Sequence, residues 1–142
     1  MNAVDTNILV YAVDADEPEK CRKARDFLRQ FGQSEPPCLM WQVAGELLAC
    51  LRRWEERRGF DSTTTRRYFE LISGNMQLVM PSPDVANVSF DLRSRFSLSH
   101  WDSMLVAACI QSGIEILYSE DLQDGMTYDS VTVHNPLKDH QA

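Results

Sequence analysis

The sequence lacks several features that would assign it to a class of protein at once. Its 142 residues contain no apolar run near the roughly 20 residues that a membrane-spanning helix needs. The start of the chain also lacks a basic segment followed by a long apolar one, so we expect neither a secretory signal nor membrane insertion. We find no internal repeat, low-complexity tract or long linker. The length therefore predicts a single domain over residues 1–142.

Cysteine is scarce, and the cysteines present are too scattered for a zinc site. The four are Cys21, Cys38, Cys50 and Cys109. None of them forms a C-x-x-C pair, and no pair of closely spaced histidines accompanies them. Sparse cysteines of this kind are typical of buried thiols in a reducing compartment, which predicts a cytoplasmic protein.

Positive charge is in short supply, since 14 basic residues face 21 acidic ones and the net charge is −7. This balance argues against a protein that holds nucleic acid mainly by bulk positive charge. The charge is unevenly distributed, however. The last third, from Asp102 onward, is rich in carboxylates that can hold metal. An arginine-rich stretch is either a surface for a polyanion or a solvated face, and it contains Arg52, Arg53, Arg57, Arg58, Arg66 and Arg67.

Strands and helices are expected to alternate along the chain. The predicted strands cover residues 2–5, 38–40, 77–80, 115–118 and 131–134. The predicted helices cover residues 16–30, 42–58, 62–72, 82–96 and 100–112, with a short helix or turn at 8–12. Ser62 or Thr63 is expected to cap the third of these longer helices, and Ser99 the last. The alternation predicts a three-layer α/β/α sandwich around a central parallel sheet of about five strands.

Four acidic residues fall where such a sheet would place a functional site. Asp5 ends the first strand and Asp121 follows the fourth, and ligands of open α/β sheets bind beyond the carboxyl ends of the strands. Asp102 lies in the first turn of a helix, where a carboxylate is favoured. Glu46 borders the apolar stripe of the helix over 42–58, where a carboxylate must be paired, protonated or metal-bound.

Carboxylates that converge on one point repel one another, and a divalent cation removes the conflict. All-oxygen ligands suit Mg²⁺ or Mn²⁺, and pairs of such ions are a recurring arrangement for cutting phosphodiesters. Each acid also has a simpler interpretation. Asp5 can be a turn residue or helix cap, Asp102 a helix-start acid, Glu46 a helix surface residue and Asp121 part of an acidic turn. The case for a site depends on the set.

Four segments carry a more specific pattern, in the order of a known family. Residues 4–12 read V-D-T-N-I-L-V-Y-A, and Glu46 lies in a predicted helix. Residues 99–108 read S-H-W-D-S-M-L-V-A-A, and residues 117–125 read L-Y-S-E-D-L-Q-D-G, which contains an S-x-D core. Asn135 and Pro136 follow the last strand. These segments resemble the PIN-domain ribonucleases, especially VapC-type toxins, over nearly the whole chain.

The resemblance implies the PIN fold and hydrolytic cleavage of RNA with Mg²⁺ or Mn²⁺. By this resemblance, Asp5, Glu46 and Asp102 are metal ligands and Asp121 completes an acidic quartet. Asp124 is the alternative for the fourth acid.

The resemblance also implies supporting residues and partners. Asn7 would support Asp5, and Ser119 would orient a ligand or water through its hydroxyl. VapC-type members form homodimers and are silenced by a cognate antitoxin protein. In this interpretation RNA is the substrate, and the arginines that can contact it are Arg52, Arg53, Arg57 and Arg58. Trp54 and Phe60 either pack in the core or lie exposed beside these arginines as part of an interface.

Rival interpretations remain at this point. A haloacid-dehalogenase-type phosphatase needs a second Asp two positions after the first, where this chain has Asn7. A receiver domain needs an acidic pair after the first strand, where Val4 precedes Asp5. A catalytically silent PIN scaffold that binds RNA or a protein partner is the third alternative. It is disfavoured because a silent scaffold has no need of four mutually repelling carboxylates.

Overall fold

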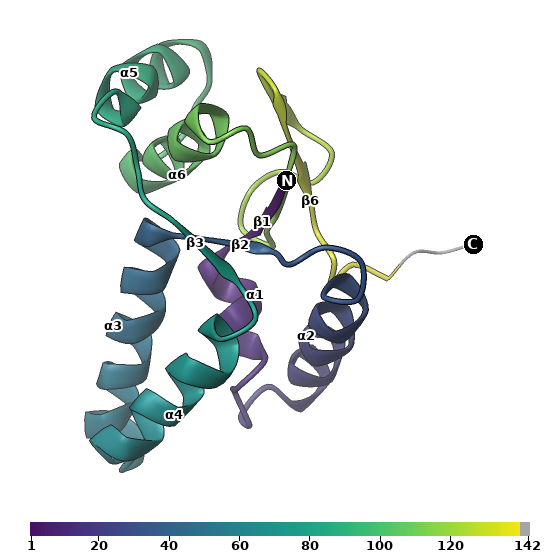
Figure 1. The fold of residues 1–142 in the computed structure, drawn as a ribbon, viewed down its shortest axis with the longest axis vertical. Helices are drawn as coiled ribbons and strands as arrows, with labels where there is room; N and C mark the ends of the chain where they lie inside the picture. Colours follow the sequence, from purple (N-terminus) through teal and green to yellow (C-terminus); the bar gives the residue numbers. More distant parts are fainter. Residues whose placement is uncertain (140–142) are drawn as a thin grey trace.

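The computed structural model of the chain describes residues 1–139 and contains six strands and six helices (Figure 1). The strands are β1 (Asn2–Val4), β2 (Cys38–Met40), β3 (Gln77–Val79), β4 (Ile116–Tyr118), β5 (Thr127–Tyr128) and β6 (Val131–His134). The helices are α1 (Thr6–Tyr11), α2 (Pro18–Phe31), α3 (Trp41–Arg58), α4 (Ser62–Ser73), α5 (Val85–Arg95) and α6 (His100–Gln111).

The strands form one sheet in the order β3-β2-β1-β4-β6-β5. All neighbours are parallel except β5, which pairs antiparallel with β6. The first strand lies near the middle of the sheet beside β4, with Val4 opposite Tyr118. The sheet therefore brings the start of the chain next to its last third.

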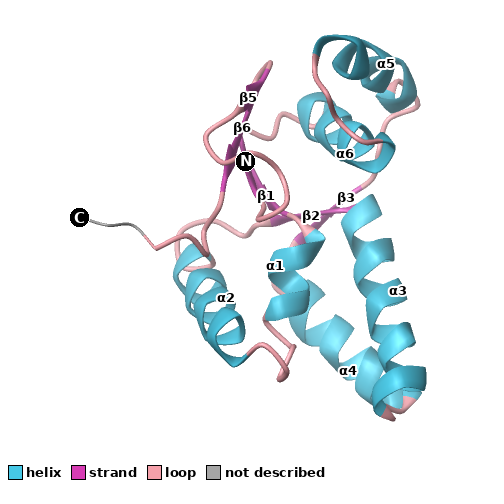
Figure 2. Cartoon of the chain, turned by 180° about the vertical axis from the view of Figure 1, so that it is seen from behind, coloured by secondary structure: helices cyan, strands magenta, loops and turns pink. Residues whose placement is uncertain are grey.

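Helices cover both faces of the sheet. Figures 1 and 2 show α5 and α6 packed together on one side, and α1, α2 and the α3–α4 pair on the other. This confirms the predicted three-layer sandwich with a mostly parallel sheet. None of the helices in residues 1–139 has both the length and the apolar character that a membrane crossing demands.

The apolar stripe of α3 forms part of the core, as its spacing predicts. Val43, Leu47 and Leu51 are fully buried, and Trp54 is nearly so. Burying side chains of this size stabilises the fold by about 1.5–3 kcal/mol each. Gly59 ends the helix in the left-handed conformation, with a φ of 71°, which glycine adopts without strain.

Two expectations need correction. The strand β5 was not predicted, because two residues joined to β6 by a two-residue turn give no visible alternation. Asp61, not Ser62 or Thr63, caps α4, and its side chain accepts from the backbone N–H of Thr64. Of the two interpretations of Trp54, core packing is confirmed, since this residue is buried against Phe60 in an edge-to-face contact.

The predicted acids are all positioned at the edge of the sheet where the parallel strands end. The chain leaves β1 directly into Asp5, leaves β2 into α3, and leaves β4 into residues 119–121. Helix α6 runs back across the sheet before β4, so its first turn lies at the same edge. Asp5 and Asp121 thus follow the ends of strands. Glu46 and Asp102 lie in helices that begin at this edge.

Candidate functional site

Asp5 lies at the centre of this edge. Its backbone N–H donates to the carbonyl oxygen of Tyr118 at 2.8 Å, which continues the pairing of β1 with β4. The side chain is only 6% exposed. Its Oδ1 accepts from the N–H of Thr6 at 2.7 Å, and its Oδ2 accepts from the hydroxyl of Ser119 at 2.8 Å. Asp5 therefore caps α1 and also faces the loop after β4.

The carboxyl group of Asp5 is held in an environment that disfavours its charge. Its pKa is raised from 3.8 to about 6, chiefly by burial, and the negative charges of Glu46 and Asp121 contribute to this rise. The hydrogen bonds from Ser119 and Thr6 oppose this effect without cancelling it. Three carboxylates from distant parts of the chain thus lie close enough to act on one another.

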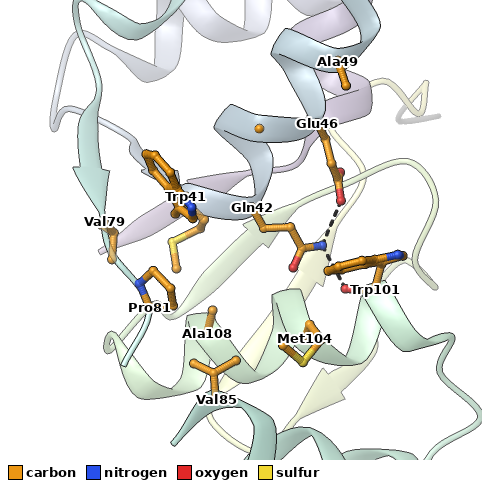
Figure 3. A pocket seen from close by; sticks show the side chains of 12 residues that line it. Trp41, Gln42, Glu46, Ala49, Val79, Pro81, Val85, Trp101, Met104 and Ala108 are labelled. Atoms are coloured by element: carbon orange, nitrogen blue, oxygen red, sulfur yellow. Dashed lines mark hydrogen bonds between the residues drawn. The ribbon is translucent and has the colours of Figure 1, made fainter. Parts of the chain in front are cut away.

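Glu46 projects from α3 toward Asp5 and is held by two side chains. The hydroxyl of Thr6 donates to Oε2 of Glu46 at 2.7 Å, and Nε2 of Gln42 donates to Oε1 at 2.9 Å (Figure 3). Thr6 therefore binds both Asp5, through its backbone, and Glu46, through its hydroxyl. Sequence reasoning missed both donors, although the four-residue spacing of Gln42 and Glu46 on one helix is a readable signal.

Ser119 organises the loop that carries Asp121. Its hydroxyl donates to Asp5, and the same oxygen accepts from the backbone N–H groups of Asp121 at 3.2 Å and Leu122 at 3.4 Å. Ser119 is fully buried, whereas the side chain of Asp121 is exposed. The predicted supporting serine thus ties the fourth acid to the first.

Asp102 is held at the same edge by a different route. Its N–H donates to the hydroxyl of Ser99, the predicted cap of α6, at 3.2 Å. The carbonyl oxygen of its neighbour Trp101 accepts from Nε2 of Gln42 at 3.0 Å. Gln42 therefore joins the first turn of α6 to Glu46. The link from Asp102 to the other acids is indirect.

The candidate ligands are of the chemical type that a divalent cation binds, but they do not lie close together. Within residues 1–139, no three His, Cys, Asp or Glu side chains stand close enough together to hold a metal ion. The donors available are carboxylate oxygens, which Mg²⁺ and Mn²⁺ prefer. The raised pKa of Asp5 beside Glu46 and Asp121 is the strain that a bound cation would relieve. The chemistry of the residues therefore fits such an ion.

Two further acids of the loop after β4 have other partners. Oδ1 of Asp124 accepts from the N–H of Asn135 at 2.8 Å, and this hydrogen bond lowers its pKa. Glu120 accepts from the hydroxyl of Tyr11 at 2.7 Å and from Nζ of Lys20 at 3.0 Å. Asp124 is thus engaged with the chain after β6. This placement favours Asp121 as the fourth acid.

Asn7 contacts the loop rather than Asp5. Its Oδ1 accepts from the N–H of Glu120 at 3.2 Å. Its Nδ2 is buried and has no hydrogen-bond partner within the described residues. Asn7 therefore supports the site by holding residues 119–121 in place, and its side-chain NH₂ group is left without a partner within the described residues.

Glu46 separates two cavities of about 520 Å³ each. The first, which we call the polar cavity, is the more polar of the two, and its lining includes Thr6, Asn7, Glu46, Arg53 and Asp121. The second, on the other side of Glu46, is largely apolar, and Ala49 lines both cavities. Two of the predicted acids, Glu46 and Asp121, thus border the polar cavity, and Glu46 also borders the apolar one.

The four arginines predicted to contact RNA differ in their placement. Arg53 and Arg57 follow Glu46 by seven and eleven residues along α3, so they lie on the same face of the helix. Arg53 lines the polar cavity. Arg52 lies on another face. Arg58 donates to Asp14 at 2.9 Å and covers the ring of Trp54, which makes it part of the protein's own packing.

Comparisons with known proteins agree on one fold. The sequence model of the PIN domain family matches residues 3–123. No curated protein matches the chain. The structure is similar to VapBC2 from Rickettsia felis, solved with a DNA fragment from their promoter, at a TM-score of 0.73 and 12% identity, covering 94% of this chain and 97% of that one.

Two further solved structures are similar. A toxin–antitoxin complex from Klebsiella pneumoniae has a TM-score of 0.67 and 17% identity, with 96% of this chain and 98% of that one covered. VapC20 from Mycobacterium tuberculosis, a toxin that cleaves the sarcin-ricin loop, has a TM-score of 0.56 and 20% identity, with 85% and 90% covered.

Proposed function

The chain belongs to the PIN domain family, and from this premise we propose that it is a metal-dependent endoribonuclease, the toxin of a VapBC-type toxin–antitoxin pair. The observation that carries the proposal is the buried Asp5, whose pKa is raised to about 6 beside Glu46 and Asp121 at the carboxyl edge of the sheet. A buried carboxyl group perturbed in this way beside other carboxylates is typical of a functional site.

In this proposal Asp5, Glu46, Asp102 and Asp121 bind Mg²⁺ or Mn²⁺. A bound ion of this kind lowers the pKa of water and neutralises charge on the phosphate. The chain's own side chains orient these ligands. Ser119 fixes Oδ2 of Asp5 through its hydroxyl, and Thr6 fixes Oε2 of Glu46. Each oxygen of these two carboxylates accepts one hydrogen bond, which leaves its second lone pair for the ion.

The substrate is proposed to be RNA that approaches along α3. Arg53 and Arg57 lie on the helix face that also carries Glu46, so they can bind phosphates on the strand leading to the acids. Arg52 offers a weaker, more distant contact. Arg58 is committed to Asp14 and Trp54, and it contributes mainly to stability.

The partners in the proposal are a cognate antitoxin and a second copy of the chain. The similar structures are VapBC2 with a promoter DNA fragment, a toxin–antitoxin complex, and a toxin that cleaves the sarcin-ricin loop. Coexpression with the protein encoded by the adjoining gene, followed by copurification, tests the antitoxin. Sedimentation velocity of the isolated chain tests the homodimer.

The alternative function is a catalytically silent PIN scaffold that binds RNA or a protein. The phosphatase and receiver interpretations are excluded by the family match. The silent scaffold is disfavoured because Asp5, buried and destabilised by its neighbours, gains nothing from that placement unless a cation joins it.

Cleavage of end-labelled structured RNA by antitoxin-free protein tests the proposal. Reactions in Mn²⁺, in Mg²⁺ and in EDTA are compared for the wild type, Asp5→Asn and Asp91→Asn. We expect metal-dependent cutting that Asp5→Asn abolishes. Asp91→Asn is the matched control, since Asp91 is an acid on α5 that is paired with Arg95. Cutting by Asp5→Asn at the wild-type rate would overturn the metal assignment.

A further inference from the structure

The apolar cavity beside Glu46 is unusual for its position. Its lining is mostly apolar and includes two tryptophans together with Met40, Val79, Pro81, Val85 and Met104 (Figure 3). An apolar recess beside a cluster of carboxylates does not serve the binding of a metal ion. It must take an apolar surface from some other molecule.

Two tryptophans stand at this cavity with more than half of their surface in water. Trp41 is 53% exposed and Trp101 is 61% exposed, and both line the recess. Large aromatic faces exposed next to a cavity are the elements on which unpaired bases of single-stranded nucleic acid stack. A cavity of about 520 Å³ has room for one base.

Gln42 supplies the cavity with one hydrogen-bond acceptor. Its Nε2 donates to Oε1 of Glu46 and to the carbonyl oxygen of Trp101. Because both partners are acceptors, the orientation of the amide is fixed, and Oε1 must point the other way. Figure 3 shows this oxygen turned into the cavity, toward Met104 and Ala108. It can accept from an N–H group of a bound base.

The cavity is continuous with the candidate catalytic site. Glu46 and Ala49 line both recesses, and Trp101 directly precedes Asp102. We propose that this cavity binds one unpaired nucleobase of the RNA substrate, stacked on Trp101 or Trp41, beside the phosphate that is cut. The proposal rests on the proposed ribonuclease function for its substrate. It predicts a preference for RNA that is single-stranded at the cleavage site.

A binding measurement that needs no cleavage tests the proposal. Fluorescence anisotropy compares a labelled single-stranded RNA tetramer with the same tetramer lacking one base, in EDTA and at low salt. The two strands carry equal charge, so the ratio of their dissociation constants isolates the contribution of the base. For the wild type we expect the complete strand to bind about tenfold more tightly.

Variants locate this preference on the protein. Trp101→Ala and Trp41→Ala are expected to bring the ratio toward one, and Trp101→Tyr to restore it, because tyrosine still offers a face for stacking. Phe90→Ala is the matched control. Phe90 is an aromatic residue that is 75% exposed on α5 and does not line the cavity. It should leave the ratio unchanged.

Two outcomes overturn the proposal. The first is a wild-type ratio of one, and the second is a ratio that survives both tryptophan-to-alanine substitutions. A ratio of one together with a dimer that Trp101→Ala converts to a monomer would make the cavity an interface between copies. Failure of the ribonuclease proposal is distinguishable. A protein that cuts no RNA can still discriminate the two strands, and one that cuts RNA without discriminating them lacks only the base site.

Discussion

The hydroxyl of Ser119 donates to Oδ2 of Asp5 at 2.8 Å across 114 positions of the sequence. The same oxygen accepts from the N–H groups of Asp121 and Leu122. One buried hydroxyl thus joins the residue after β1 to the loop after β4.

Removal of this hydroxyl should weaken the fold and the site together. Ser119→Ala leaves a buried carboxylate and two N–H groups short of a partner, which costs about 1–3 kcal/mol for an unsatisfied buried group. We expect a lower urea midpoint and a further rise in the pKa of Asp5. Ser89→Ala, which removes a buried hydroxyl on α5, is the control for the loss of a hydroxyl alone. Equal midpoints for Ser119→Ala and the wild type would contradict the linking role of Ser119.

Asp5→Asn should make the metal-free protein more stable at neutral pH. The pKa of Asp5 is about 6 in the fold against 3.8 as its ordinary value, so the folded state binds the proton more tightly. Its contribution to stability is therefore present below about pH 4 and is lost as the pH rises to about 6. The shift corresponds to about 3 kcal/mol, less the hydrogen bond that the amide makes poorly with Ser119.

Urea denaturation at pH 4 and at pH 7.5 checks this sign. The variant should exceed the wild type at pH 7.5, and the advantage should shrink at pH 4. A variant that is less stable at pH 7.5 would indicate that Asp5 serves mainly as the cap of α1.

Divalent cations should stabilise the folded protein through the same carboxylates. A ligand present at 100 times its dissociation constant adds about 2.7 kcal/mol. We expect Mn²⁺ to raise the melting temperature of the wild type, EDTA to reverse the rise, and Asp102→Asn to reduce it. Asp91→Asn, an acid paired with Arg95 on α5, is the control. An equal response of all three proteins would place the ion elsewhere.

The arginines of α3 should separate into two kinds. Arg53→Ala is expected to weaken RNA binding several-fold and to reduce the slope of log affinity against log salt by about one, because one phosphate contact is lost. Arg58→Ala should instead lower the free energy of unfolding, since it breaks the contacts with Asp14 and Trp54. Anisotropy in a salt series and urea denaturation measure the two effects. Identical behaviour of the two variants would contradict the division.

Much of the architecture could be predicted from local patterns. The apolar stripe from Val43 to Trp54 specified α3, and the hydroxyl of Ser99 specified the start of α6. Pattern failed where an element was too short to show one, as in β5. It also failed at α4, where three polar residues in a row, from Asp61 to Thr63, were all suitable caps.

The candidate site was predictable in its members but not in its contacts. The acids were visible because each follows a strand end or begins a helix. The donors that hold them, Thr6 and Gln42, depend on how α1 and α3 pack, which no local pattern records. The same is true of Asp124, whose partner Asn135 comes from the chain after β6. Whether the quartet acts as proposed stays a prediction.

The position of β1 near the middle of the sheet has a consequence for the making of the protein. A ribosome releases β1 before its neighbour β4, and the serine that binds Asp5 follows Asp5 by 114 positions. Pairing at this sequence separation is slow to form. A nascent or truncated chain that stops before β4 cannot assemble the site. If the protein is a nuclease, the cell producing it is spared cleavage until β4 and Ser119 have been translated.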